Sequence, residues 1–313
     1  MDVKVLAEEM EKNINKVIKG KEDIVHLAVA AFLAGGNILL EEVPGSGKTM
    51  FAKTMAATIG GVFKRIQMTP DLLPADITGI NFFNMKKSEF EFVEGPVFSN
   101  ILLADEINRA TPKTQAGLLE CMEEKQVTIE GKTYELKKPF MVIATENPVD
   151  NQGVFPLPEA QTDRFLMKLS MSYPDHKSMF DIMKTHMSGF DMDIIKPVGD
   201  IGTFIEAMNT VNNVFVHDDI IEYIVNITEM SRKHPKVYLG ISQRGALGII
   251  KASRAIAAMD GRDYVKPDDV KMVYPAVIRH RIILKNSERL IKDNMEDVLE
   301  EIINSVNVPA ELF

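Results

Sequence analysis

The chain has 313 residues, of which 45% are apolar and 26% are charged, and its formal net charge is -9. This length fits about two globular domains, and the composition is ordinary globular usage. The acidic balance argues against general nucleic-acid binding, because proteins that hold phosphates usually carry a basic surface. Cys121 is the only cysteine, which excludes a disulfide framework and a zinc site built from cysteines.

Targeting signals are not evident in the sequence. No apolar run approaches the roughly 18 residues of a membrane-spanning helix. Residues 1–23 are charged and amphipathic, and they lack the apolar centre and the cleavage site of a signal peptide. We therefore expect a cytoplasmic protein without membrane insertion.

Three short apolar runs in the first half predict strands. Continuous apolar runs flanked by helical patterns are typical of parallel strands that are buried on both faces. The runs cover residues 37–40, 101–106 and 140–145.

Helical patterns lie between these runs. Lys48 begins a segment with apolar side chains at every fourth residue, which ends before a Gly-Gly pair. Thr111 and Pro112 form a favourable N-cap and first-turn pair for the next helix. The β-α-β alternation predicts an α/β domain over residues 1–172.

A predicted hairpin follows, and beyond it the sequence patterns become mainly helical. Residues 126–136 alternate apolar and polar side chains around a Glu-Gly turn, which predicts a β-hairpin. Beyond Tyr173 the patterns are helical, with predicted helices near Asp218, Ser242 and Asn294. We expect an all-α lid domain over residues 173–313.

The strongest local feature is the Gly-rich turn in NILLEEVPGSGKT (37–49), between a predicted strand and a predicted helix. Backbone N–H groups of such a turn wrap a phosphate, and the helix dipole favours the anion. Lys48 is expected to reach the β- and γ-phosphates, and the Thr49 hydroxyl to bind Mg²⁺. We therefore expect ATP and Mg²⁺ as cofactors, with the nucleotide held by Pro44, Gly45, Ser46, Gly47, Lys48, Thr49 and Met50.

This turn departs from the full P-loop pattern at one position, where Glu42 replaces glycine. The remaining PGSGKT still carries the groups that contact phosphate. The alternative is a Gly-rich turn that carries Lys-Thr by chance.

Polar side chains end the second and third predicted strands. Asp105 and Glu106 follow an apolar run, at the sheet edge where α/β proteins bind ligands. Asp105 is expected to hold Mg²⁺, and Glu106 to orient the attacking water. Asn147 is expected to contact the γ-phosphate or that water. The alternatives are two solvated acids at the start of a loop and an Asn-Pro turn.

Together these residues resemble the MoxR family of the AAA+ superfamily. The likeness spans nearly the whole chain, in the stretches VPGSGKT, MTPDLLPADITG, GPVFSNILLADEINRATPKTQAGLLECMEEKQVTIEG, ATENPVDNQGVFPLPEAQTDRF, SQRGALGIIKASRA and GRDYVKPDDVKMVYPAVIRHRIIL. It implies an AAA+ P-loop core with a parallel sheet, followed by a helical lid. Residues 65–79 and 126–136 correspond to the family's two insertions, which face the ring pore or a partner.

The resemblance also implies roles for arginines and for an adenine loop. Arg164 matches the arginine finger that reaches the γ-phosphate of the adjacent subunit; the alternative is a salt bridge to Asp163. Arg244 matches the second sensor arginine, whose guanidinium faces the nucleotide phosphates. Ser242 is expected to cap the helix that carries Arg244 in its first turn. The adenine is expected against the loop of Val17, Ile18 and Gly20.

Some residues of the matching stretches carry no clear role. Glu146 stands where much of the family has Gln beside the sensor Asn147. His280 and Arg281 match the family pattern, but they suggest only packing between lid helices.

The resemblance implies a catalytic homo-hexamer that remodels an unknown client protein, in partnership with a separate von Willebrand A-domain protein. A DNA-translocating helicase is the first alternative, since helicase relatives share the hairpin insertion. Lys125, Lys132, Lys137 and Lys138 lie near it in this chain. A nucleotide-sensing scaffold with little turnover is the second alternative.

Overall fold

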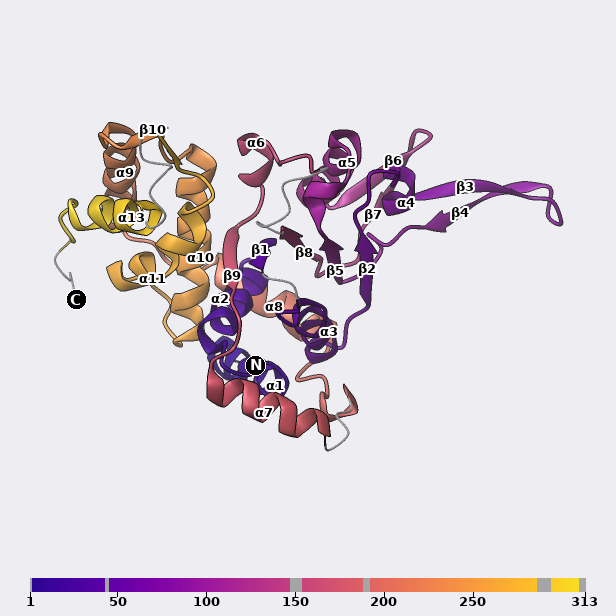
Figure 1. Cartoon of the computed structure of the whole chain (residues 1–313), viewed down its shortest axis with the longest axis horizontal. Coiled ribbons are helices and arrows are strands. Elements are labelled where there is room, and N and C mark those ends of the chain that lie inside the picture. The colour runs from indigo at the N-terminus through magenta and orange to yellow at the C-terminus, as the bar shows by residue number, and fades with distance from the viewer. Residues whose placement is uncertain (1, 43–44, 147–153, 188–191, 286–293, 310–313) are drawn as a thin grey trace.

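The computed structural model describes residues 2–42, 45–146, 154–187, 192–285 and 294–309 (Figure 1). At its centre is a five-stranded sheet in the order β2-β5-β8-β1-β9, in which all neighbouring strands are parallel. The strands are β1 (Ile38–Glu42), β2 (Phe63–Gln67), β5 (Ile101–Asp105), β8 (Met141–Glu146) and β9 (Met167–Met171).

The three predicted strands are confirmed as β1, β5 and β8, the inner strands of this sheet. Every residue of β5 is buried, as is all of β8 except Glu146, which explains why their sequences are continuous apolar runs. The outer strands β2 and β9 were not predicted. β2 exposes most of its side chains, so its sequence lacks the apolar signal.

Helices cover both faces of the sheet in the first half of the chain (Figure 1). The predicted helices that follow the Gly-rich turn and Thr111 are confirmed as α3 and α5. The helices of this part are α1 (Val3–Ile14), α2 (Glu22–Leu33), α3 (Lys48–Thr58), α4 (Pro74–Thr78), α5 (Pro112–Glu124) and α6 (Glu159–Thr162).

The second half is helical, as expected, apart from the two short paired strands β10 (Val237–Leu239) and β11 (Ile283–Leu284). One continuous hydrophobic core joins α1–α3 to the described helices from residue 201 onward. α8 packs against α1 and α2 as well as α10, and the domain boundary at 172/173 stays a prediction. The helices are α7 (His176–Met187), α8 (Ile201–Asn212), α9 (Asp218–Lys233), α10 (Gln243–Met259), α11 (Pro267–Ile278) and α13 (Asn294–Asn304).

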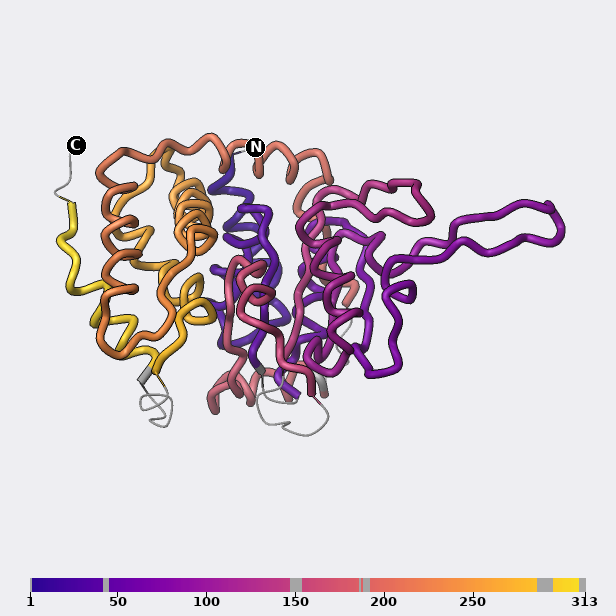
Figure 2. Tube along the Cα trace, turned by 90° about the horizontal axis from the view of Figure 1, so that it is seen from above, coloured from indigo at the N-terminus to yellow at the C-terminus, as the bar shows by residue number. Residues whose placement is uncertain are grey.

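Two β-hairpins project from the α/β part, the longer one far from the body (Figures 1 and 2). The hairpin of β6 (Gln126–Ile129) and β7 (Lys132–Glu135) confirms the sequence prediction. The hairpin of β3 (Gly79–Asn84) and β4 (Glu89–Glu94) was not predicted as strands, since the expected insertion ended at residue 79.

The two hairpins support each other at the base of the longer one. Phe92 stacks on Tyr134 with ring centroids 4.2 Å apart, and Asn81 donates a hydrogen bond of 2.7 Å to Glu130. Beyond this contact the longer hairpin exposes apolar side chains, including Met85 and Phe90. Within the described part of the chain, every helix is too short or too polar to cross a lipid bilayer.

Candidate functional site

The Gly-rich turn leaves open space between β1 and α3. Gly45 and Gly47 have φ of +82° and +94°, a backbone conformation that favours glycine. A Cβ added at either glycine meets no protein atom within 4 Å. Gly47 also precedes α3 without a side-chain cap, so the positive end of this helix faces the turn. The turn therefore fits a phosphate group.

Asp105 lies at the end of β5 beside this turn. It is only 1% exposed, and its Oδ1 accepts from Lys48 Nζ at 2.7 Å and from Thr145 Oγ1 at 2.9 Å. Its Oδ2 accepts from Arg65 Nη2 at 2.6 Å. The structure thus brings together Lys48 and Asp105, which the sequence assigned to phosphate and metal.

Two effects compete at the Asp105 carboxyl. Burial disfavours its charge, but hydrogen bonds from Lys48, Thr145 and Arg65 outweigh this effect and lower its pKa below the ordinary value. Asp105 is therefore ionised at neutral pH, as a ligand of a cation must be.

Glu106 is the residue after β5, and it adopts φ of 56°, which is uncommon for residues other than glycine. Its backbone N–H donates to Thr145 Oγ1 at 2.8 Å. Its Oε2 accepts from Gln67 Nε2 at 2.9 Å and lies 3.0 Å from Arg109 Nε. The carboxylate is thus fixed by two neighbours.

Arg65, Gln67, Arg109 and Thr145 were not recognised as part of the site from the sequence. Arg65 and Gln67 stand on β2, which has no apolar signal. Only their position at strand ends could have indicated these residues from the sequence, since the carboxyl ends of parallel strands meet at one edge of the sheet.

Two further carboxylates lie at the same edge of the sheet. Lys168 Nζ is 3.3 Å from Glu41 Oε1 and 3.6 Å from Glu146 Oε2. Burial raises the pKa of Glu146, with Glu41 adding to the effect and Lys168 opposing it. Asn147, Pro44 and the side chain of Glu42 lie outside the described residues, so the roles predicted for Asn147 and Pro44 stay predictions.

The other residues predicted to contact the nucleotide differ in their burial and in their hydrogen bonds. Ser46, Thr49 and Met50 are half-buried next to the turn, and Met50 packs against the core. The N–H groups of Val17 and Ile18 both donate to the Ile14 carbonyl.

Gly20 has φ of +67° and lies against Ser178 of α7. Since the N–H groups of Val17 and Ile18 are already used, an adenine contact from these two residues needs their carbonyls or side chains, and the assignment stays a prediction.

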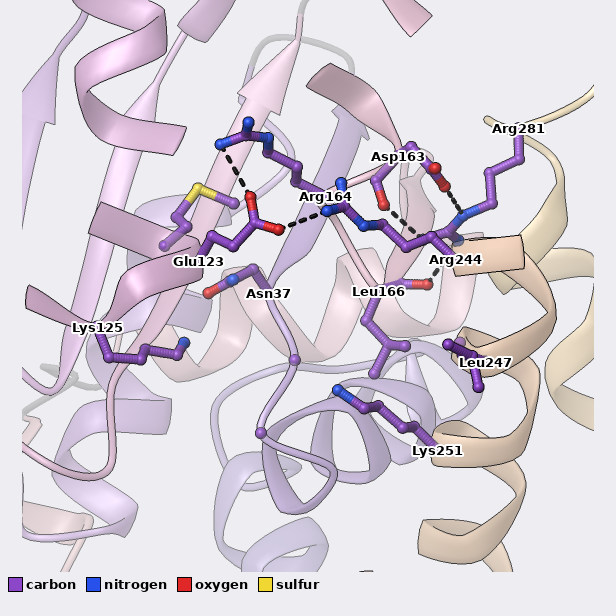
Figure 3. A pocket seen from close by; sticks show the side chains of 14 residues that line it. Asn37, Glu123, Lys125, Asp163, Arg164, Leu166, Arg244, Leu247, Lys251 and Arg281 are labelled. Carbon is purple, nitrogen blue, oxygen red and sulfur yellow. Dashed lines mark hydrogen bonds and ion pairs between the residues drawn. The ribbon is translucent and has the colours of Figure 1, made fainter. Parts of the chain in front are cut away.

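Arg164 and Arg244 lie together in a different place (Figure 3). Both bind Glu123 of α5: Arg164 Nη1 lies 3.1 Å from Oε2, and Arg244 Nη2 donates to Oε1. The two arginines line a cavity of about 320 Å³ between α5, the segment before β9 and α10. Glu123 was not recognised from the sequence, because nothing in the spacing of residues 123, 164 and 244 connects them.

The salt bridge between Arg164 and Asp163, considered as an alternative role, is not formed. Asp163 Oδ1 instead lies 2.6 Å from Arg281 Nε, and Asp163 Oδ2 accepts from Ser242 Oγ at 2.9 Å. Ser242 also caps α10 by accepting from the Gly245 N–H, as predicted.

His280 and Arg281 do more than pack between lid helices. His280 Nε2 donates to the Phe165 carbonyl at 3.0 Å. Arg281 donates to the carbonyls of Asp163, Phe165 and Leu166. The two residues therefore attach the segment that carries Arg164 to the end of α11.

The arginine pair and the Gly-rich turn lie at opposite ends of β1. The cavity is lined by Gly35, Gly36 and Asn37, which precede β1, whereas the turn follows it. A five-residue strand spans about 17 Å, which is beyond the reach of an arginine side chain. Neither arginine can therefore contact a phosphate bound at Lys48 of its own chain.

Comparisons with known proteins agree with this architecture. Residues 37–167 match the ATPase family associated with various cellular activities (AAA), and residues 229–302 match the AAA lid domain. YeaC, an uncharacterized protein of Bacillus subtilis (strain 168), is 47% identical over 96% of this chain and 94% of its own length.

A named relative and a solved structure are also similar. Chaperone MoxR1 of Mycobacterium tuberculosis is 39% identical over 95% of this chain and 80% of its own length. A crystal structure from Cytophaga hutchinsonii superimposes with a TM-score of 0.91 at 36% identity, covering 98% of this chain and 96% of that one. The Gly-rich turn, the acids at the end of β5, the helical lid and these relatives together place the chain in the MoxR family of AAA+ ATPases.

Proposed function

We propose that this protein hydrolyses ATP with Mg²⁺ at the junctions between subunits of a homo-hexameric ring in the cytoplasm. The candidate site residues form two groups, here called half-sites, at opposite ends of β1, and this placement supports the proposal most directly. Lys48, Asp105 and Glu106 lie at one end of β1, and Arg164 and Arg244 lie at the other. A complete phosphate site then requires two copies of the chain.

Each half supplies a different part of the chemistry. Lys48 and Thr49 would bind phosphates and the metal, and Asp105 would hold Mg²⁺, which neutralises charge on the phosphates. Glu106 would orient the attacking water, and Asn147 would assist it. The described residues contain no group of three or more His, Cys, Asp and Glu side chains that could hold a metal. This fits Mg²⁺, which usually takes several ligands from water and phosphates.

We further propose that ATP turnover remodels or matures a client protein, with a separate von Willebrand A-domain protein as partner. The named relative MoxR1 is a chaperone. The exposed apolar side chains of the β3–β4 hairpin offer a surface for a protein.

The helicase alternative has less support. Lys125 does not lie on the β6–β7 hairpin, because it ends α5 and its Nζ lies 5.3 Å from the centre of the Phe140 ring. Lys138 pairs with Glu135 at 3.9 Å. The strands and turn of the hairpin carry one lysine, Lys132, beside Glu130 and Glu135. The hairpin therefore presents little net positive charge to DNA.

The test is ATP turnover by the wild type and by Glu106→Gln. The amide keeps the size of the side chain but cannot polarise water as a carboxylate does. We expect unchanged ATP binding and a turnover lowered at least about 100-fold. Glu124→Gln, on the exposed end of α5, is the matched control.

The outcomes separate the alternatives. Turnover by Glu106→Gln equal to that of the wild type would remove Glu106 from the mechanism. A wild type that binds ATP without hydrolysing it would support the nucleotide-sensing scaffold. DNA binding that weakens with salt would support the helicase.

A further inference from the structure

We propose that Glu123 is a positioning residue, which holds Arg164 and Arg244 as one unit for the nucleotide of a neighbouring subunit. The inference rests on the function proposed above. One carboxylate binds both guanidinium groups, each through a different oxygen (Figure 3). The arginines come from different elements, the segment before β9 and the first turn of α10.

The charges in the cavity show why the pair needs a carboxylate. Lys125, Lys251 and Arg281 line the same cavity as the two arginines, so the surroundings are strongly positive. The other acid of the lining, Asp163, is bound to Arg281 and Ser242. Without Glu123, the two guanidinium groups would repel each other and separate.

Glu123 does not prevent the arginines from binding phosphate. An arginine has five N–H donors, and the contact with Glu123 uses one terminal nitrogen of each guanidinium. The side chains of Arg164 and Arg244 are 32% and 46% exposed. The pair can therefore meet an incoming triphosphate while it remains bound to Glu123.

The strength of the contacts indicates an ordering role. Ion pairs between partly exposed side chains are weak and are screened by salt. A triphosphate carries several negative charges and would easily outcompete one carboxylate if the two competed. Glu123 thus restricts the rotamers of the two long arginine side chains before the nucleotide arrives. As a result, these side chains lose less conformational entropy when they bind the phosphates.

The backbones that carry the arginines are held independently of Glu123. Asp163 binds Arg281 and Ser242, and these residues join the segment before β9 to α10 and to the end of α11. Replacement of Glu123 should therefore displace the guanidinium groups without displacing the lid. Glu123 itself is exposed, so its variants should fold.

The experiment compares Glu123→Ala and Glu123→Gln with the matched control Glu124→Ala. ATP turnover gives kcat and KM, and a fluorescent ATP analogue reports nucleotide affinity. For Glu123→Ala we expect kcat to fall roughly 10- to 100-fold, because a displacement of about 1 Å has costs of this order. Nucleotide affinity should change less than kcat, because the Gly-rich turn and Lys48 of the neighbouring subunit still hold the phosphates. Glu123→Gln should fall between the wild type and Glu123→Ala, because its amide oxygen can still accept from one arginine.

Mixed rings distinguish positioning in trans from a general structural effect. Glu123→Ala subunits mixed with Lys48→Ala subunits should regain activity, because a Lys48→Ala subunit presents an intact arginine pair to an intact phosphate loop. Mixing Glu123→Ala with Arg164→Ala should give no gain, since neither subunit supplies an intact pair.

Several results would overturn the proposal. An unchanged kcat in Glu123→Ala would show that the carboxylate does not matter, and an increased kcat would show that it restrains the arginines. Equal rescue by both mixtures would exclude action in trans. Absence of turnover by the wild type would instead contradict the proposed function.

Discussion

Lys48 at the start of α3 and Asp105 of β5 form an ion pair of 2.7 Å across the end of the sheet. The same carboxylate binds Arg65 and Thr145, so it keeps partners when Lys48 turns toward a phosphate. This arrangement orders the lysine beside the open turn of Gly45 and Gly47 and keeps Asp105 ionised.

Replacement of Lys48 should therefore impair nucleotide binding more than stability. In Lys48→Ala the loss of a hydrogen bond to a charged group corresponds to about 1.5–3 kcal/mol, or roughly 10- to 100-fold weaker ATP binding, measured by calorimetry. Lys53→Ala, on an exposed position of the same helix, is the control and should bind ATP like the wild type. Equal affinities of the two variants would contradict a phosphate contact from Lys48.

Two inactive variants should restore each other if the half-sites meet between subunits. If Arg164 is the proposed finger and Lys48 the proposed phosphate contact, rings of Arg164→Ala alone or of Lys48→Ala alone should be nearly inactive. A mixed ring contains junctions in which an intact Lys48 faces an intact Arg164. We expect turnover to reach a maximum at an intermediate mixing ratio, which steady-state assays can follow. Activity no higher than the mean of the two parents at every ratio would exclude a finger in trans.

The sequence was informative where one physical constraint acts on a short stretch. Buried strands require continuous apolar runs, which identified β1, β5 and β8. A turn that fits a phosphate requires glycines before a helix, which indicated Gly45–Thr49 as a candidate site. Ser242 was identified as a cap, because the first turn of a helix needs an acceptor.

Contacts between distant segments left no comparable signal. Glu123 meets Arg164 and Arg244 only because the end of α5, the segment before β9 and the start of α10 lie at one place in the fold. Arg65 reaches Asp105 because β2 pairs with β5. The β3–β4 hairpin shows some alternation of apolar residues, but the expected insertion ended before it.

Arg281 should be essential for stability. Its side chain is 2% exposed, and it binds the Asp163 carboxylate and several carbonyls. Arg281→Ala leaves the Asp163 carboxylate with Ser242 as a donor and the Phe165 carbonyl with His280, and it removes the buried charge that pairs with Asp163. Breaking such a buried pair costs about 3–5 kcal/mol. Arg281→Lys should restore little of the lost stability, because an ammonium group lacks the planar set of donors of a guanidinium group.

The control for this prediction is Arg279→Ala. Arg279 is paired with Glu296, which is 59% exposed, and loss of such a pair should change the free energy of unfolding by at most about 1 kcal/mol. Denaturant unfolding at pH 7 measures both variants. A loss in Arg281→Ala no larger than in Arg279→Ala would show that the segment carrying Arg164 does not depend on this anchor.

His280 should make stability depend on pH. Burial lowers its pKa well below 6.5, and the nearby charge of Arg281 adds to the effect, while the hydrogen bond to Phe165 opposes it. Above about pH 6.5 the imidazole is neutral in both the folded and the unfolded chain. Below that pH the unfolded chain binds a proton that the folded chain does not, so the free energy of unfolding should fall by about 1.4 kcal/mol per pH unit from this residue.

The measurement is the free energy of unfolding between pH 7.5 and pH 5 for the wild type and His280→Gln. The glutamine amide can still donate to the Phe165 carbonyl but does not titrate in this range. As the pH falls, the free energy of unfolding should decrease less for His280→Gln than for the wild type. His176→Gln, at an exposed position at the start of α7, controls for the loss of a histidine as such. Parallel pH profiles for the wild type and His280→Gln would mean that His280 accepts a proton in the folded protein as easily as in the unfolded chain.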